Sequence, residues 1–158
     1  MGDAAHAIVP FYGQGMNASF EDVAVFDDIL NEVDFDLDKA FVKFSKTRKK
    51  DADGIADLAL DNFYEMKAHT AQDLFIKKRE LELAFEKEFP QQYSSKYALV
   101  TFDEHIGYHK AKVRGRAQDK VILHLLKQKK LDINQNLKKQ LNLVLQKTDQ
   151  YLNGEILI

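Results

Sequence analysis

Apolar residues recur at intervals of three and four along most of this chain, the spacing typical of amphipathic helices. The first such segment covers about residues 16–31. Its apolar stripe consists of Met16, Phe20, Val23 and Leu30. We expect this stripe to be buried. The acidic side chains expected to face away are Glu21, Asp22, Asp28 and Glu32.

Two further helices are predicted before residue 70. Asp34 and Asp36 are good caps for the first of them, which should run toward the basic segment 46–50. Gly54 permits a break there, so we expect a new helix after it. The apolar stripe of that helix consists of Ile55, Leu58, Ala59, Asn62, Phe63 and Met66. Asn62 therefore lies on an apolar face.

The second half of the chain predicts more helix and one short strand. A weaker apolar stripe, interrupted by Lys78, indicates a helix from about Ala71 that Pro90 must end. Residues 96–102 alternate in the manner of a strand, with Tyr97 near the start. Helices over about 110–130 and 137–152 follow, joined at 132–134. We expect a mainly α chain with a short β element.

Composition supports a helical, cysteine-free domain. The 158 residues are 45% apolar and 30% charged, with only 7 Gly and 2 Pro, which favours helix over strand. Without cysteine there is neither a disulfide nor a thiolate metal site, and a reducing compartment is compatible. No apolar run reaches the roughly 18 residues that span a bilayer, so we expect no transmembrane anchor and a cytoplasmic protein.

Charge is unevenly distributed although the net charge is only −2. Residues 1–38 hold nine acidic and no basic side chains, whereas residues 105–148 hold eleven basic and two acidic ones. The lysines follow the amphipathic pattern without a nucleic-acid signature, so we expect no nucleic-acid partner. His105 and His109 are four apart, but no further ligand completes a motif, and we expect no metal site.

The candidate chemistry lies in residues 2–22. The carboxylate of Asp3 could accept hydrogen bonds from a cofactor's polyol chain, or it could cap a local turn, which is the commoner role. Gly13 and Gly15 form a tight turn that leads into a helix at Met16 and Asn17. The free N–H groups and positive dipole end of that helix would stabilise an anion or an electron-rich ring.

Residues 2–22 resemble the second flavin-binding motif of class A FAD-dependent monooxygenases, and are most similar to the kynurenine 3-monooxygenase family. Later segments agree with that family in order and spacing: Asp57 and Leu58, residues 62–69, residues 97–102 and Tyr108. The resemblance covers about residues 2–126. It implies an enzyme that uses FAD, NADPH and O2 to hydroxylate L-kynurenine to 3-hydroxykynurenine.

The resemblance also implies roles for individual residues. Asp3 would bind the ribityl chain of FAD, Pro10 would lie beside the reacting flavin carbon, and the backbone around the turn would hold the pyrimidine edge. The residues of that turn are Gly13, Gly15, Met16 and Asn17. The residues implied to contact kynurenine are Phe11, Asn62, Glu65, Met66 and Tyr97. No residue of the chain is assigned as a catalytic nucleophile, acid or base.

Part of the family pattern is not found in this sequence. No Gly-x-Gly-x-x-Gly follows a strand, so we expect the rear part of an α+β enzyme, lacking the Rossmann-type unit and requiring an N-terminal FAD-binding half as partner. Animal members carry a C-terminal membrane anchor. No such anchor is predicted here, so a bacterial-type member is expected. The expected divisions are 1–33 for the flavin motif, 34–104 for the substrate pocket and 105–158 for a helical region.

Two alternatives stay open at this stage. One is another class A flavin hydroxylase with a different aromatic substrate. The other is a non-catalytic helical interaction fragment, for which the same helices would serve only as a binding surface.

Overall fold

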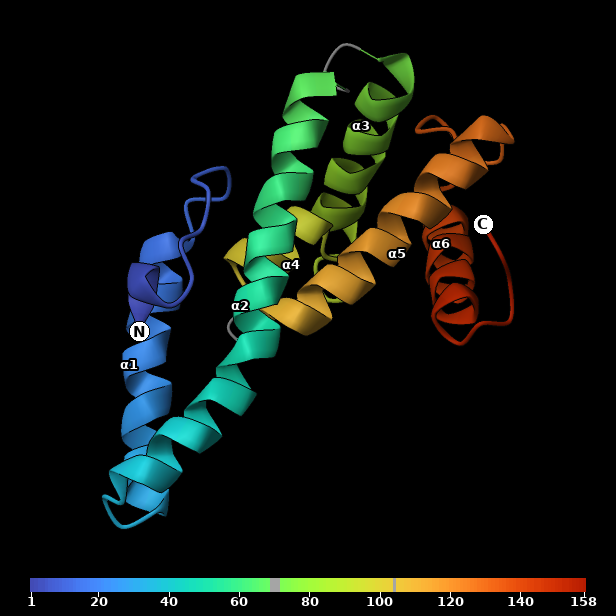
Figure 1. Cartoon of the computed structure of the whole chain (residues 1–158). Coiled ribbons are helices and arrows are strands. Elements are labelled where there is room, and N and C mark those ends of the chain that lie inside the picture. Colours follow the sequence, from blue (N-terminus) through green and yellow to red (C-terminus); the bar gives the residue numbers. More distant parts are fainter. Residues whose placement is uncertain (69–71, 104) are drawn as a thin grey trace. The chain divides into compact units, whose positions relative to one another are not determined.

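The structure is a computed structural model that describes residues 1–68, 72–103 and 105–158 (Figure 1). All regular secondary structure in these ranges is helical, which confirms the predicted mainly α class. The elements are a 3-10 helix η1 (Gly2–Ala4) and the α-helices α1 (Gly15–Glu32), α2 (Leu37–Ala68), α3 (Asp73–Glu88), α4 (Lys96–Thr101), α5 (Tyr108–Lys127) and α6 (Leu137–Leu152).

The chain divides into two compact units. The first unit contains residues 1–64 and 107–110, and the second contains residues 65–106 and 111–158. Helices α2 and α5 are continuous across the division. Each unit has its own buried residues.

The first unit is built on a helical hairpin formed by α1 and the first part of α2 (Figure 1). The connection turns sharply because Asp34 and Phe35 adopt positive φ angles of 51° and 62°. Asp36 then caps α2 as predicted, since its Oδ1 accepts a hydrogen bond from the backbone N–H of Lys39 at 3.1 Å. Across the hairpin, the ring of Phe26 stacks on Phe41 with ring centroids 5.4 Å apart.

The predicted break at Gly54 is wrong, because α2 runs without interruption through that residue. Gly54 serves close packing instead. A Cβ atom placed on Gly54 would lie 2.8 Å from the backbone nitrogen of His109, which is closer than real side chains approach. The missing side chain therefore lets the backbone at the start of α5 lie directly on α2.

The predicted burial of α1 is also wrong, although its bounds are confirmed. Met16 and Phe20 are each 67% exposed and Val23 is 55% exposed. The buried side chains of α1 are Ala18, Asp22 and Ile29, and Asp22 is one of the residues predicted to face away. The small and charged face of α1 packs inward because Arg48 of α2 lies against it and pairs with Asp22.

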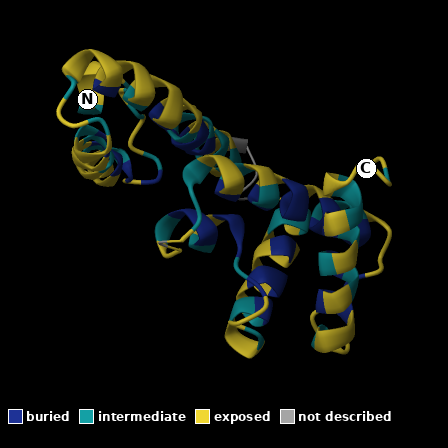
Figure 2. Ribbon diagram, turned by 90° about the horizontal axis from the view of Figure 1, so that it is seen from below, coloured by how far each residue is buried: buried dark blue, intermediate teal, exposed yellow. Residues whose placement is uncertain are grey.

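The second unit has a larger apolar core. It is formed mainly by α3, α5 and α6, with Phe85, Ile122 and Leu141 among its fully buried residues. The helices predicted here are confirmed, and the joint at 132–134 lies between α5 and α6. The predicted helix start at Ala71 lies outside the described residues. In Figure 2 the buried positions follow narrow stripes along the helices, while much of the remaining surface is exposed.

The predicted strand over residues 96–102 is wrong. These residues form α4, and no strand occurs in the described ranges. The side chain of Ser95 accepts a hydrogen bond from the backbone N–H of Ala98 and so caps the helix. Lys96, Leu99 and Val100 are buried, and their spacing of three and four is helical. Over so few residues, alternation and helical spacing select overlapping apolar positions.

Candidate cofactor and substrate site

The glycine turn before α1 leaves open space above its backbone. Gly13 has a φ of +70°, which favours glycine, and a Cβ atom on either Gly13 or Gly15 would meet nothing within 4 Å. Gln14 is the N-cap residue of α1, but its side chain forms no cap hydrogen bond. Its Oε1 instead accepts a hydrogen bond from Asn17 Nδ2 at 2.8 Å. The first turn of α1 thus lacks a side-chain cap, and the turn suits a ligand that accepts hydrogen bonds.

Asp3 and Pro10, the other predicted cofactor residues, are both exposed. Asp3 lies in η1, directly after Gly2, whose φ is +61°. Met16 and Asn17 also expose their side chains at the start of α1.

A buried ionic cluster holds this loop against the hairpin. The carboxylate of Asp22 accepts hydrogen bonds from the backbone N–H of Gly2 at 2.8 Å and from Arg48 Nε at 2.8 Å. It also contacts His6 Nε2 at 2.6 Å. Burial raises the pKa of Asp22, but these donors outweigh it and the pKa is lowered overall. Asp22 is therefore an ionised anchor for the residues that precede α1.

Sequence reasoning missed this cluster. Asp22 was expected to face solvent, and Arg48 was read as part of a basic helix end; the structure buries both side chains. Arg48 Nη2 also lies 3.1 Å from Glu21 Oε2. Asp22 and Arg48 are 26 residues apart in the sequence, so no local pattern links them.

Tyr108 ties the glycine turn to the start of α5. Its hydroxyl donates a long hydrogen bond, 3.5 Å, to Gln14 Oε1. Burial raises the pKa of Tyr108, and the carboxylates of Glu21 and Asp51 raise it further, so the phenol stays protonated and can donate. Asp51 in turn accepts a hydrogen bond from the backbone N–H of His109 at 2.9 Å.

Phe11 and Asn62, two of the predicted substrate residues, are brought into direct contact. Asn62 Nδ2 donates a hydrogen bond to the carbonyl oxygen of Phe11 at 2.6 Å. The ring of Phe11 packs on Phe63 with ring centroids 4.7 Å apart and an interplanar angle of 41°. Both side chains are half-buried. The loop that carries Phe11 is therefore attached to α2 at the position that carries Asn62.

The remaining predicted substrate residues lie in the second unit. Glu65 and Met66 are residues of α2. Glu65 pairs with Lys96 of α4. Tyr97, the next residue of α4, is 44% exposed, and its ring lies edge-on to Phe102 with centroids 6.0 Å apart.

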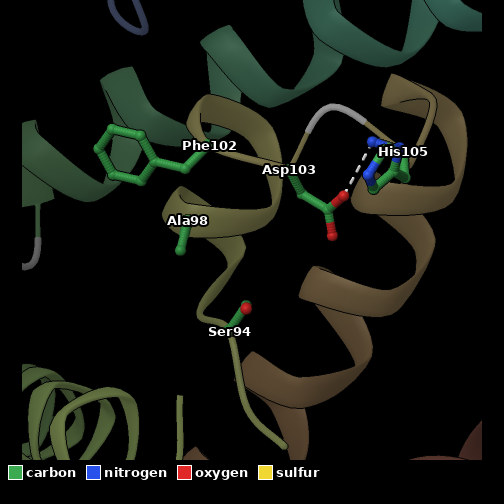
Figure 3. Close-up of a pocket in the computed structure, with 5 residues that line it drawn as sticks. All are labelled: Ser94, Ala98, Phe102, Asp103 and His105. Carbon is green, nitrogen blue, oxygen red and sulfur yellow. Dashed lines mark hydrogen bonds between the residues drawn. The ribbon is translucent and has the colours of Figure 1, made fainter. Parts of the chain in front are cut away.

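Two cavities of the second unit are lined by other residues. One, of about 290 Å³, is lined by Ser94, Ala98, Phe102, Asp103 and His105 (Figure 3). In it, Asp103 Oδ1 accepts a hydrogen bond from the backbone N–H of His105 at 3.0 Å. The other, of about 250 Å³, is lined by α5, α6 and the C-terminal residues 156–158. None of the predicted site residues lines either of these two cavities.

Over residues 1–68, 72–103 and 105–158, no cluster of three or more His, Cys, Asp or Glu side chains could hold a metal ion. Within the same ranges, no helix is both long enough and apolar enough to cross a bilayer.

Several known proteins similar to this chain are named kynurenine 3-monooxygenase. No protein-family model matches the chain. A kynurenine 3-monooxygenase of Flavobacterium psychrophilum is 40% identical over 134 residues, which is 85% of this chain and 30% of that protein. The corresponding protein of Sus scrofa is 43% identical over 122 residues, covering 77% of this chain and 26% of the relative. That of Myxococcus xanthus is 41% identical over 125 residues, covering 79% and 26%.

These relatives define a flavoprotein monooxygenase class, and the open glycine turn at the start of α1 is compatible with it. Within that class, the chain belongs to the kynurenine 3-monooxygenase family, and it is similar to a C-terminal portion of such proteins. The chain spans less than a third of the length of these relatives, at 30%, 26% and 26%.

Proposed function

We propose that this chain forms part of an FAD- and NADPH-dependent monooxygenase that hydroxylates L-kynurenine to 3-hydroxykynurenine. The observation that carries the proposal is the identity of 40% over 134 residues to a protein named for that activity. Bound FAD would supply the oxygen-activating chemistry. The residues of this chain would bind FAD, orient kynurenine and exclude water from the site.

The glycine turn is the proposed contact for the pyrimidine edge of FAD. Its support is the open space above Gly13 and Gly15 and the first turn of α1 without a side-chain cap. Backbone N–H groups of Met16 and Asn17 would donate to an electron-rich edge, and the helix dipole adds to that effect. Asp3 would accept from ribityl hydroxyls, and Pro10 would lie beside the ring.

Asn62 and Tyr97 are proposed to orient kynurenine by hydrogen bonds, with Phe11, Glu65 and Met66 lining the same site. The bond from Asn62 Nδ2 to the Phe11 carbonyl supports this role because it fixes the plane of the amide. The Oδ1 atom of that amide is then held in one direction as an acceptor for a substrate amino group. Phe11 and Met66 would exclude water around the aromatic ring.

An FAD-binding portion is the proposed partner, and the exposed stripe of α1 is the proposed contact for it. Met16, Phe20 and Val23 are each more than half exposed, which is unusual for three large apolar side chains on one helix face. In these relatives, the part outside the matched segment is more than twice as long as the matched segment. Burying such a side chain stabilises an interface by roughly 1.5–3 kcal/mol.

The direct experiment combines this chain with the flavin-binding portion of the Flavobacterium psychrophilum relative. NADPH oxidation and product are measured with L-kynurenine and with other aromatic acids. Asn62→Ala should raise the KM for kynurenine about tenfold, the effect of one hydrogen bond to a charged group. The matched control is Asn142→Ala, an exposed amide of α6, which should leave KM unchanged.

The alternatives predict different results. Stimulation by another aromatic acid and not by kynurenine would indicate a different class A hydroxylase. If the chain neither retains FAD nor restores activity, the reading as a non-catalytic helical interaction fragment is preferred.

A further inference from the structure

Buried charges of alternating sign run through the second unit and end at a proposed substrate residue. Lys96 Nζ pairs with Glu65 and lies 2.7 Å from Asp119 Oδ2. The other oxygen of Asp119 lies 2.7 Å from Lys78 Nζ, which is 3.0 Å from Glu82 Oε1. The series therefore joins α2, α4, α5 and α3 in turn.

Lys96 is the member that joins the two proposed substrate elements. It is the first residue of α4, directly before Tyr97, and its side chain reaches Glu65 on α2. Lys96 is only 5% exposed, so its charge is largely removed from water. Burial lowers the pKa of Lys96, but the carboxylates of Asp119 and Glu65 outweigh it and raise the pKa overall. The side chain therefore stays charged.

Gly115 of α5 shows how closely the stem of Lys96 is enclosed. A Cβ atom on Gly115 would lie 2.6 Å from Cγ of Lys96 and 3.1 Å from its Cα. Only glycine leaves room for α4 to lie this close to α5. With its stem against Gly115 and its ammonium on Asp119, Lys96 has little freedom to release Glu65.

A buried ion pair adds little to stability, because the desolvation of the two charges costs about as much free energy as their attraction provides. Its best attested role is to specify one arrangement over others. We infer that Lys96 is a positioning residue, which holds the Glu65 carboxylate and the adjacent Tyr97 in one fixed arrangement. This inference rests on the proposed function, in which both residues face kynurenine.

A role limited to stability makes a different prediction from a positioning role. Lys78 offers the matched control, because it is also a buried lysine, 7% exposed, and it also pairs with Asp119. Its other ion pair is with Glu82. If the cluster only stabilises the unit, Lys78→Met and Lys96→Met should have the same consequences. If Lys96 positions Glu65 and Tyr97, only Lys96→Met should disturb those two residues.

The first arm of the test uses the full 158-residue chain and NMR. In Lys96→Met, the side-chain resonances of Glu65 and Tyr97 should shift and broaden, and Lys96→Arg should restore them in part. Lys78→Met should lower the melting temperature without moving those resonances. Equal changes in both methionine variants, or none in Lys96→Met, would overturn the inference.

The second arm uses the enzyme assembled with the flavin-binding portion of the Flavobacterium psychrophilum relative. Lys96→Met should raise the KM for kynurenine about tenfold with a smaller change in kcat, and Lys96→Arg should recover most of it. Lys78→Met should keep KM within about twofold. If the assembly is active and Lys96→Met leaves the KM for kynurenine unchanged, this inference is wrong and the proposed function is unaffected. If kynurenine does not stimulate the assembly, the proposed function is wrong, and the NMR arm then decides whether Lys96 holds Glu65 and Tyr97.

Discussion

Gly54 lies in the middle of α2, where glycine usually costs stability. A change to alanine in a helix interior normally stabilises by roughly 0.5–1 kcal/mol. Here the added Cβ would meet backbone atoms of Tyr108 and His109 at 2.8–3.0 Å, and backbone cannot rotate away. Gly54→Ala should therefore lower the free energy of unfolding by about 1–3 kcal/mol, measured by urea denaturation.

Gly15→Ala is the control for Gly54→Ala. Gly15 is also helical, but a Cβ atom there would meet nothing within 4 Å. Its free energy of unfolding should stay the same or rise. A loss in Gly15→Ala equal to that in Gly54→Ala would mean that close packing is not the reason for Gly54.

Asp22 should make the first unit sensitive to acid. Its pKa is lowered in the folded state, because hydrogen bonds from Gly2, Arg48 and His6 outweigh its burial. Its contribution is therefore complete above the unfolded pKa of about 3.9 and is lost as the pH falls toward the lower folded value. Asp22→Asn should cost about 3 kcal/mol at pH 7 and less below pH 4, measured by denaturation across pH. A cost that does not depend on pH would contradict this account.

At the residue scale, the sequence predicts the special role of some residues and not of others. Asn62 could be singled out because an amide on an apolar stripe is visible in the spacing. Asp22 could not, because its partner Arg48 is on another helix and the pairing depends on how α1 rotates. Glycine at position 54 signals either a break or a close approach, and only the neighbouring backbone distinguishes them.

Helix α4 depends on its cap more than the longer helices do. Six residues are too few for a helix to be stable by propensity alone. Ser95→Ala removes the acceptor for the Ala98 N–H and should cost about 1 kcal/mol. Hydrogen exchange of the backbone amides of residues 98–100 should speed up. Ser94→Ala changes a neighbouring serine that is not the N-cap residue, and exchange there should stay slow.

The apolar stripe of α1 should matter for assembly and not for folding. Replacing Phe20 and Val23 by glutamine changes side chains that are 67% and 55% exposed, so stability should move by less than about 0.5 kcal/mol each. Binding to the flavin-binding portion should weaken strongly, measured by calorimetry. Leu83→Gln alters an apolar side chain of α3 that is 49% exposed and should leave binding intact. If the variant with glutamine at Phe20 and Val23 binds as tightly as Leu83→Gln, this stripe is not the contact.

At the scale of elements, spacing located the helices but not always their inward faces. Helices α3, α5 and α6 were predicted well because they share a core and bury their apolar stripes. Helix α1 buries Ala18, Asp22 and Ile29, so Met16, Phe20 and Val23 predicted the wrong face. The segment 96–102 was too short for its period to separate a helix from a strand.

At the scale of the whole molecule, the family assignment depends on similarity to known proteins more than on any single sequence pattern. Relatives named kynurenine 3-monooxygenase match most of the chain, while the chain spans under a third of their length, at 26–30%. The site residues predicted from the motif lie in both units, with Phe11 and Asn62 in one and Glu65, Met66 and Tyr97 in the other. Because the chain spans under a third of these relatives, the proposed chemistry is tested with a flavin-binding portion of the family added.

The most direct measurement is the formation of 3-hydroxykynurenine by an assembly of this chain with a flavin-binding portion from the family, followed by chromatography. We predict that product forms with NADPH and L-kynurenine only when both parts are present, and that Asn62→Ala reduces it about tenfold at low substrate while Asn142→Ala does not. An assembly that retains FAD and oxidises NADPH but yields no hydroxylated kynurenine would contradict the account.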